Sequence, residues 1–146
     1  MLVRLWSMFR CQRGASAVEF AIIVSPLLML VFGVCEYARM LWSQSALQQT
    51  AIVGARCIGL LQTSCASGGV LSTTNAISFI QTTAAGWMIT LPSSGITITQ
   101  STSCGGVSGF SSVQLSYTFV SAVPYLFSFS TSGVNLVSSA CFPTAS

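Results

Sequence analysis

Few side chains in this sequence could carry acid–base, nucleophilic or metal chemistry. Its 146 residues include five arginines, two glutamates and six cysteines, but no histidine, lysine or aspartate. A serine or cysteine nucleophile would therefore lack a histidine base. A paired-carboxylate site would need Glu19 and Glu36 together, but on one helix they would lie about 25 Å apart. The composition argues against an enzyme and predicts no cofactor and no small-molecule substrate. A small thiol-dependent enzyme is a remote alternative.

Metal and nucleic-acid binding are equally disfavoured. The cysteines are irregularly spaced and form no Cys-x-x-Cys pair, so we expect no zinc site. Three arginines precede Gly14, and beyond it two arginines balance two glutamates. No basic surface remains to follow a phosphate backbone.

An apolar run from Ala17 to Cys35 has the length of a membrane span. Its 19 residues cross most of a hydrocarbon core of ~30 Å at the helical rise. Arg4, Arg10 and Arg13 flank its N-terminal side, so the positive-inside rule predicts a cytoplasmic N-terminus and an external C-terminal part.

Three interpretations of this segment are open: a secretory signal peptide, a plain signal anchor, and a leader cut on the cytoplasmic side, after Gly14. The run is longer than the apolar region of an ordinary signal peptide, and no Ala-x-Ala site follows it. These two features disfavour the first interpretation.

Glu19 bears on the choice between the other two. A carboxylate in an apolar span costs about 2.5–3.5 kcal/mol at mid-membrane, and less near an end. Glu19 could simply be tolerated at the interface. Alternatively, cleavage before Ala15 would create an α-amine, a cation at neutral pH, that pairs with Glu19 of a neighbouring subunit. Pro26, in mid-span, is expected to kink the helix, with Ser25 or neighbouring helices satisfying the freed backbone.

The segments Arg13–Ala21, Ser25–Leu28 and Phe32–Arg39 together resemble the N-terminal region of TadE-like proteins. These are pseudopilin-like minor pilins of the tight-adherence (Tad, or Flp) pilus system. The family pattern is a basic residue and glycine, small residues, Val-Glu-Phe, an apolar segment with a proline, and Gly-x-x-Glu-aromatic. The resemblance covers about residues 13–57.

The resemblance implies processing by a prepilin peptidase between Gly14 and Ala15, and retention in the bacterial inner membrane. It also implies assembly through the hydrophobic helix, with Glu19 and Phe20 in the assembly segment. The expected partners are the peptidase, other pilins or pseudopilins, inner-membrane Tad assembly proteins and the lipid bilayer.

The rest of the chain predicts an α+β fold. One helix is expected over residues 17–57, with a buried stripe, and a second over 74–87, capped by Thr73 or Thr74. Three or four antiparallel strands follow in the alternating stretches near 96–98, 113–119, 127–129 and 133–141. The predicted stripe of the first helix comprises Tyr37, Met40, Leu41, Leu47, Ala51, Ala55 and Ile58. The predicted face of the second comprises Ile77, Ile80, Ala84 and Met88.

Four cysteines would lie in an oxidising compartment under this topology, and they allow three pairings. We favour Cys57 with Cys65, closing the loop after the first helix, and Cys104 with Cys141, joining the late strands; buried free thiols are the alternative. Cys11 in the leader and Cys35 at the membrane boundary are expected to be unpaired. An apolar cluster at Tyr125–Phe127 is interpreted as core rather than an exposed tip.

The predicted domain organisation is a leader at 1–14, a transmembrane helix at 15–38 and an external domain at 39–146, which divides into a helical stem (39–57) and an α+β remainder (58–146). We predict a non-enzymatic, pilin-like membrane protein that takes part in the assembly of a Tad pilus. The alternative is an uncleaved single-pass envelope domain that binds another envelope protein.

Overall fold

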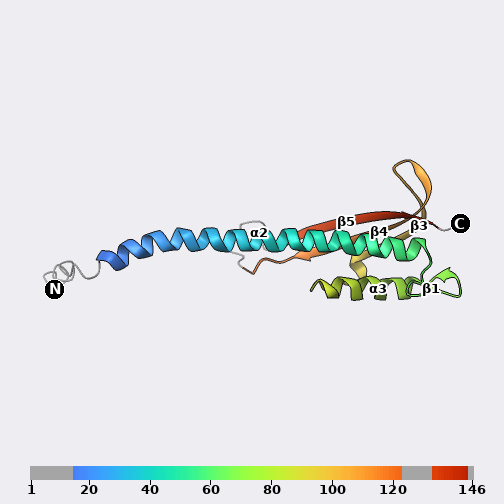
Figure 1. Cartoon of the computed structure of the whole chain (residues 1–146), viewed down its shortest axis with the longest axis horizontal. Coiled ribbons are helices and arrows are strands. Elements are labelled where there is room, and N and C mark those ends of the chain that lie inside the picture. The colour runs from blue at the N-terminus through green and yellow to red at the C-terminus, as the bar shows by residue number, and fades with distance from the viewer. Residues whose placement is uncertain (1–14, 123–132, 145–146) are drawn as a thin grey trace.

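The computed structural model describes residues 15–122 and 133–144. In these residues a long helix, α2 (Ala15–Gly59), projects beyond a small domain with its first half and packs against that domain with its second (Figure 1). The domain holds the shorter helix α3 (Thr73–Gly86) and a three-stranded antiparallel sheet. This is the predicted α+β arrangement.

Helix α2 is continuous through Pro26. The amide that proline lacks would have bonded to the carbonyl of Ile22. The Ser25 hydroxyl instead donates to the carbonyl of Ala21, at 2.8 Å, so it does not satisfy the freed group. The predicted role of Ser25 is therefore not seen in the described residues, and neighbouring helices are the predicted alternative.

The second half of α2 buries a face that differs in part from the predicted stripe. Leu47, Ala51, Ala55 and Ile58 are buried as expected. Tyr37 and Leu41 are exposed, so their assignment to the stripe was wrong. The buried face also holds three polar residues that were not predicted for it: Glu36, Ser43 and Thr50.

Helix α3 begins and ends one residue earlier than predicted. Its N-cap is Ser72, whose hydroxyl accepts from the Asn75 amide at 3.4 Å, rather than Thr73 or Thr74. Ile80 and Ala84 face the core, but Met88 lies beyond the helix and points into the surroundings. Met88 does not belong to the helical face because the helix ends at Gly86.

The sheet has the order β3-β4-β5, formed by β3 (Ile96–Cys104), β4 (Val107–Phe119) and β5 (Val134–Pro143). A 3-10 turn, η3 (Ser93–Gly95), leads into β3. A two-stranded hairpin of β1 (Ala66–Ser67) and β2 (Val70–Leu71), turning at Gly68 and Gly69, was not predicted. The expected strand at 127–129 and the Tyr125–Phe127 cluster lie outside the described residues.

The core forms where α2 meets one face of the sheet and α3. Val113 and Leu115 of β4 alternate with exposed or half-buried residues and point into it with Leu47, Ile58 and Ile80. The end of α2 and the end of β5 approach each other closely at Gly59. A Cβ added to this glycine would lie 2.8 Å from both a ring carbon of Phe142 and the carbonyl oxygen of Pro143.

Glutamines of α2 bond to the edge strand β5. The side-chain amides of Gln44 and Gln48 donate to the carbonyls of Val137 and Ser139, at 3.2 and 3.4 Å. Unpaired edge groups of a sheet invite pairing with other chains. The stem helix therefore both completes the core and covers part of this edge.

Two disulfides join the pairs favoured from the sequence. Cys57–Cys65 closes the loop between α2 and the hairpin, and both residues are buried. Cys104–Cys141 links the two outer strands, β3 and β5, across β4. This second link lies where the register of β3 against β4 shifts, so it holds the curled end of the sheet.

Candidate functional site

The projecting half of α2 has the properties of a membrane span. The helix from Ser16 is long and apolar enough to cross a bilayer, with a mean hydropathy of 2.4 in its best window and none of that window buried. The domain thus provides no cover for this segment. Exposure of so many apolar side chains to water would be unfavourable. A lipid bilayer, or helices of other subunits, would provide the missing cover.

The predicted processing and assembly residues lie at the start of this segment. Gly14 lies outside the described residues, and Ala15 is the first residue of α2. Glu19 follows one helical turn later and is exposed, as is Phe20. Glu19 forms no ion pair with any residue in the described ranges. In the described part of the chain, no cation neutralises this carboxylate.

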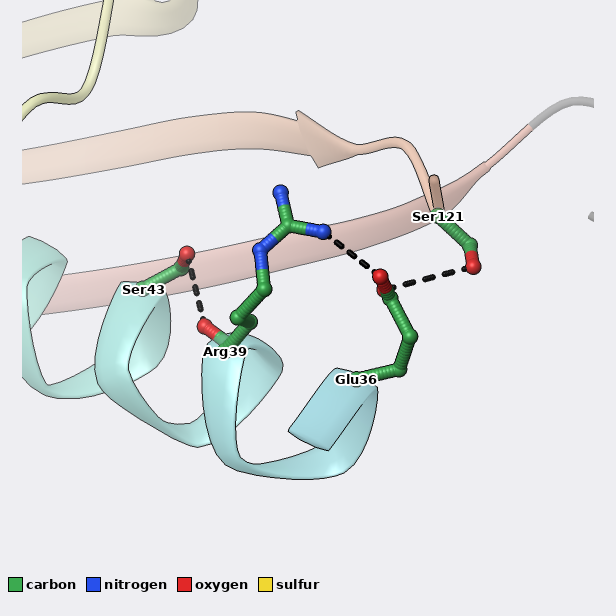
Figure 2. A network of polar contacts seen from close by, with 4 residues as sticks. All are labelled: Glu36, Arg39, Ser43 and Ser121. Atoms are coloured by element: carbon green, nitrogen blue, oxygen red, sulfur yellow. Dashed lines mark hydrogen bonds and ion pairs between the residues drawn. The ribbon is translucent and has the colours of Figure 1, made fainter. Parts of the chain in front are cut away.

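A second polar group lies where α2 meets the domain, and we call it the Glu36 cluster: Glu36, Arg39, Ser43 and Ser121. Arg39 donates from Nη1 to Glu36 Oε1 at 2.7 Å, and Ser121 donates from Oγ to Glu36 Oε2 at 3.3 Å (Figure 2). Ser43 donates to the Arg39 carbonyl at 3.0 Å.

The cluster joins parts of the chain that are far apart in sequence. Ser121 follows the end of β4 and lies 85 residues from Glu36. The Arg39 guanidinium lies 5.6 Å from the ring centre of Phe119, the last residue of β4, a cation–π distance. Glu36 is only 8% exposed. Both oxygens of this carboxylate have partners, which a buried charge requires.

The ion pair between Glu36 and Arg39 follows from their spacing of three residues on one helix, but the tertiary contacts were missed. The sequence contained one usable signal. Glu36, Met40, Ser43 and Leu47 recur at steps of four, three and four, the spacing of a single helical face. Apolar residues surround the helix at this level, so hydrophobicity could not identify the buried face.

The described residues offer little for other chemistry. They contain no group of three or more histidine, cysteine or acidic side chains able to hold a metal ion. Four cysteines are consumed in disulfides, and Cys35 is a free, exposed thiol at the end of the apolar run, unpaired as expected. A thiol enzyme would need a base that this histidine-free chain lacks.

Comparison with known protein families finds a match that follows most of α2. Residues 14–56 match the model of the TadE family, described as TadE-like protein. This confirms the resemblance inferred from the sequence and is consistent with a TadE-like Tad pilus protein. The TadE-like pilus family is generally non-enzymatic. No curated protein and no solved structure matches the chain.

The matched segment ends three residues before α2 does. The family signal is therefore carried by the helix, including both Glu19 and Glu36, whereas the sheet and α3 lie outside it. The match points to involvement in the Tad pilus system, and the apolar helix points to membrane anchoring.

We expect Glu36→Gln to lower the free energy of unfolding of the domain by about 1 kcal/mol. The substitution removes the charge that faces Arg39 but keeps the size of the side chain. Arg39→Gln should have a smaller effect because the arginine side chain is 55% exposed. Urea unfolding of the full chain in detergent micelles, followed by near-ultraviolet circular dichroism, measures both. Equal stability of wild type and Glu36→Gln would show that the cluster contributes nothing.

Proposed function

We propose that this protein is a non-enzymatic, pilin-like subunit of Tad pilus assembly, cut by a prepilin peptidase after Gly14. The observation that carries the proposal is the arrangement of α2. An uncovered apolar segment begins next to the proposed cleavage site and carries a carboxylate without a partner in the described residues. The match to the TadE-like family over residues 14–56 supports it.

The proposed topology places the leader, residues 1–14, in the cytoplasm and residues 15–38 in the bacterial inner membrane. Residues 39–146 form the extracytoplasmic domain. The three arginines of the leader support this orientation. So do the two disulfides of the domain, because such bonds persist in oxidising compartments.

Assembly is proposed to proceed by helix packing with charge pairing. Cleavage frees an amine at Ala15, four residues before Glu19 on the same helix. Four residues correspond to about 6 Å of helical rise. A neighbouring helix displaced by about this distance along the axis brings its amine level with Glu19. The pair then sets the register between subunits.

The partners in this proposal are prepilin peptidase, other pilins or pseudopilins, and inner-membrane Tad assembly proteins. The exposed side chains of the span supply the contact area. In a bilayer, helices associate through close packing and polar contacts rather than through the hydrophobic effect. Glu19 is suited to provide the polar contact.

The N-terminus of the mature protein tests the proposal. We expect the chain isolated from its native host to begin at Ala15, as determined by N-terminal sequencing and intact mass. Gly14→Ala should leave the leader attached, because the peptidase is expected to require glycine at this position. The matched control is Gly33→Ala, a glycine in the same helix but away from the cleavage site, which should be processed normally.

A native chain that still begins at Met1 would overturn the proposed cleavage after Gly14. It would favour the alternative, an uncleaved single-pass anchor for a domain that binds another envelope protein. Processing of Gly14→Ala at the normal rate would also contradict the assignment of Gly14.

A further inference from the structure

Exposed apolar side chains gather at the end of the domain nearest the proposed membrane span. We call this group the membrane-proximal rim. It is formed by α2, by the residues after α3 and by the residue after β4: Tyr37, Leu41, Trp42, Trp87, Met88 and Val120.

The rim residues lie at one level because contacts tie them to the same turns of α2. The Trp42 and Trp87 rings meet edge to face, with centroids 5.9 Å apart. Ser121, next to Val120, bonds to Glu36. The end of α3 and the end of β4 thus both reach α2 between residues 36 and 42 (Figure 1).

The position of the rim along the axis of α2 matches the depth of the lipid headgroups. Trp42 follows residue 38, the end of the proposed membrane span, by four residues, about 6 Å of helical rise. The headgroup layer of one leaflet adds about 5–8 Å beyond the hydrocarbon core. Headgroup layers extend a bilayer from a core of about 30 Å to about 40–45 Å, and tryptophan and tyrosine are enriched at this depth. The rim is therefore continuous with the uncovered surface of the span.

Packing of the domain does not account for the exposure of Trp87 and Met88. The residues that follow, Ile89 and Leu91, are buried, whereas Met88 is 96% exposed. Met88 also adopts a φ of 60°, at a position after a helix where glycine is usual. The left-handed residue ends the helix, with the Met88 and Ile89 amides bonded to the carbonyls of Ala85 and Ala84, and it leaves the apolar side chain pointing outward.

Charge also favours a lipid surface. Beyond the apolar run that ends at Cys35, the charged residues in the described part of the chain are Glu36, Arg39 and Arg56. The carboxylate of Glu36 is buried and paired, whereas the Arg39 side chain is 55% exposed at the level of the rim. No exposed acidic group in the described residues of the domain would repel anionic phospholipids.

We propose that the membrane-proximal rim inserts into the headgroup layer of the outer leaflet and holds the domain against the membrane before assembly. Trp42 and Trp87 lie within the headgroup layer, and Met88 enters it from the end of α3. Because α2 and α3 both reach the layer, the domain contacts the bilayer at more than the single point of its anchor. This inference rests on the proposed membrane span.

The test measures the depth of Trp87 in a bilayer. The full chain carrying Trp6→Phe and Trp42→Phe, which leaves Trp87 as its only tryptophan, is reconstituted into vesicles of phosphatidylcholine and phosphatidylglycerol. The lipids carry a nitroxide either near the headgroup or near the acyl terminus. We expect the shallow nitroxide to quench Trp87 about twofold more than the deep one, as for side chains inserted about 5–10 Å.

Two further variants in the same background provide the matched comparison. Met88→Ser should reduce shallow quenching of Trp87, because it removes the apolar side chain that enters the layer. Val70→Ser, at an exposed valine in the hairpin at the far end of the domain, should not change it (Figure 1). Equal effects of the two substitutions would overturn the specific role of the rim.

The outcomes separate this inference from the proposed function. Leu28→Trp, in a chain whose other tryptophans are phenylalanine, reports on the span and should be quenched by the deep nitroxide. If it is not, the span itself is wrong. If Leu28→Trp is quenched but Trp87 is quenched only by aqueous acrylamide, the rim does not enter lipid. Trp87 shielded from both lipid and acrylamide would indicate a protein partner and would likewise overturn the proposal.

Discussion

Replacement of Glu19 by leucine is expected to weaken association with other pilus subunits about tenfold to a hundredfold, without loss of membrane insertion. A carboxylate in an apolar span costs about 2.5–3.5 kcal/mol at mid-membrane and less near the end, where Glu19 lies. If assembly pairs this charge with the Ala15 amine of a neighbour, part of that free energy depends on the contact. Leucine removes the charge pair and leaves the amine without its partner.

Co-purification from native membranes with the other subunits, together with counts of surface pili, measures the effect. Glu19→Asp is the matched control because it keeps the charge, and it should restore at least part of the association. Glu19→Gln should behave like Glu19→Leu if charge is decisive, or like Glu19→Asp if a hydrogen bond is enough. Wild-type association of Glu19→Leu would exclude charge pairing while leaving processing after Gly14 intact.

The sequence allowed the long helix to be predicted within two residues at each end. Its apolar run, its polar second half and the glycines after it all indicate the same element. The strands were predicted for a related reason. In β4, Val113 and Leu115 alternate with Gln114 and Ser116, and this alternation is the periodicity of a sheet with one buried face.

The buried face of α2 near the membrane could not be predicted in the same way. Between residues 37 and 42 apolar side chains occur all round the helix, because this part lies next to the span. The face that contacts the domain is marked by Glu36 and Ser43, which bond to Ser121 and to the helix backbone. The sequence of the helix alone does not show that these polar residues face the domain, because this depends on where the end of β4 packs.

The ends of the helices and the hairpin depend on tertiary contacts that leave weak signals in the sequence. Ser72 caps α3 while its amide donates to the Cys65 carbonyl, so the cap is fixed by the hairpin before it. Gly68 and Gly69 both have positive φ values and form the turn of the hairpin, which was not predicted. The Cys57–Cys65 disulfide fixes the start of that unit next to α2.

The structure also explains why the family match follows one helix. Under the proposed function, residues of α2 must suit the membrane, the cleavage site, the neighbouring subunits and the domain core at once. The sheet needs only to bury one face against α2 and α3, a requirement that many alternating sequences meet. The recognisable part of the chain is therefore the part with the most simultaneous constraints.

Leu47→Ala is expected to destabilise the domain by about 2–5 kcal/mol, the largest effect on stability that we predict. Leu47 is 0% exposed at the centre of the contact between α2 and the domain. Truncation removes buried methyl groups and leaves a cavity that the surrounding core fills only in part. The matched control is Leu41→Ala, since Leu41 is 49% exposed on the same helix and should change stability by about 0.5 kcal/mol or less.

Urea unfolding of both variants in detergent micelles distinguishes the observed face from the face predicted by hydrophobicity alone. If the stripe inferred from the sequence were the true core face, Leu41→Ala and Leu47→Ala would have similar effects. A difference of about 2 kcal/mol or more between them supports the packing described above. The substitution of Leu41 also bears on the rim. A variant that folds normally but loses quenching of Trp87 by shallow nitroxide lipids would show that Leu41 acts at the membrane surface rather than in the core.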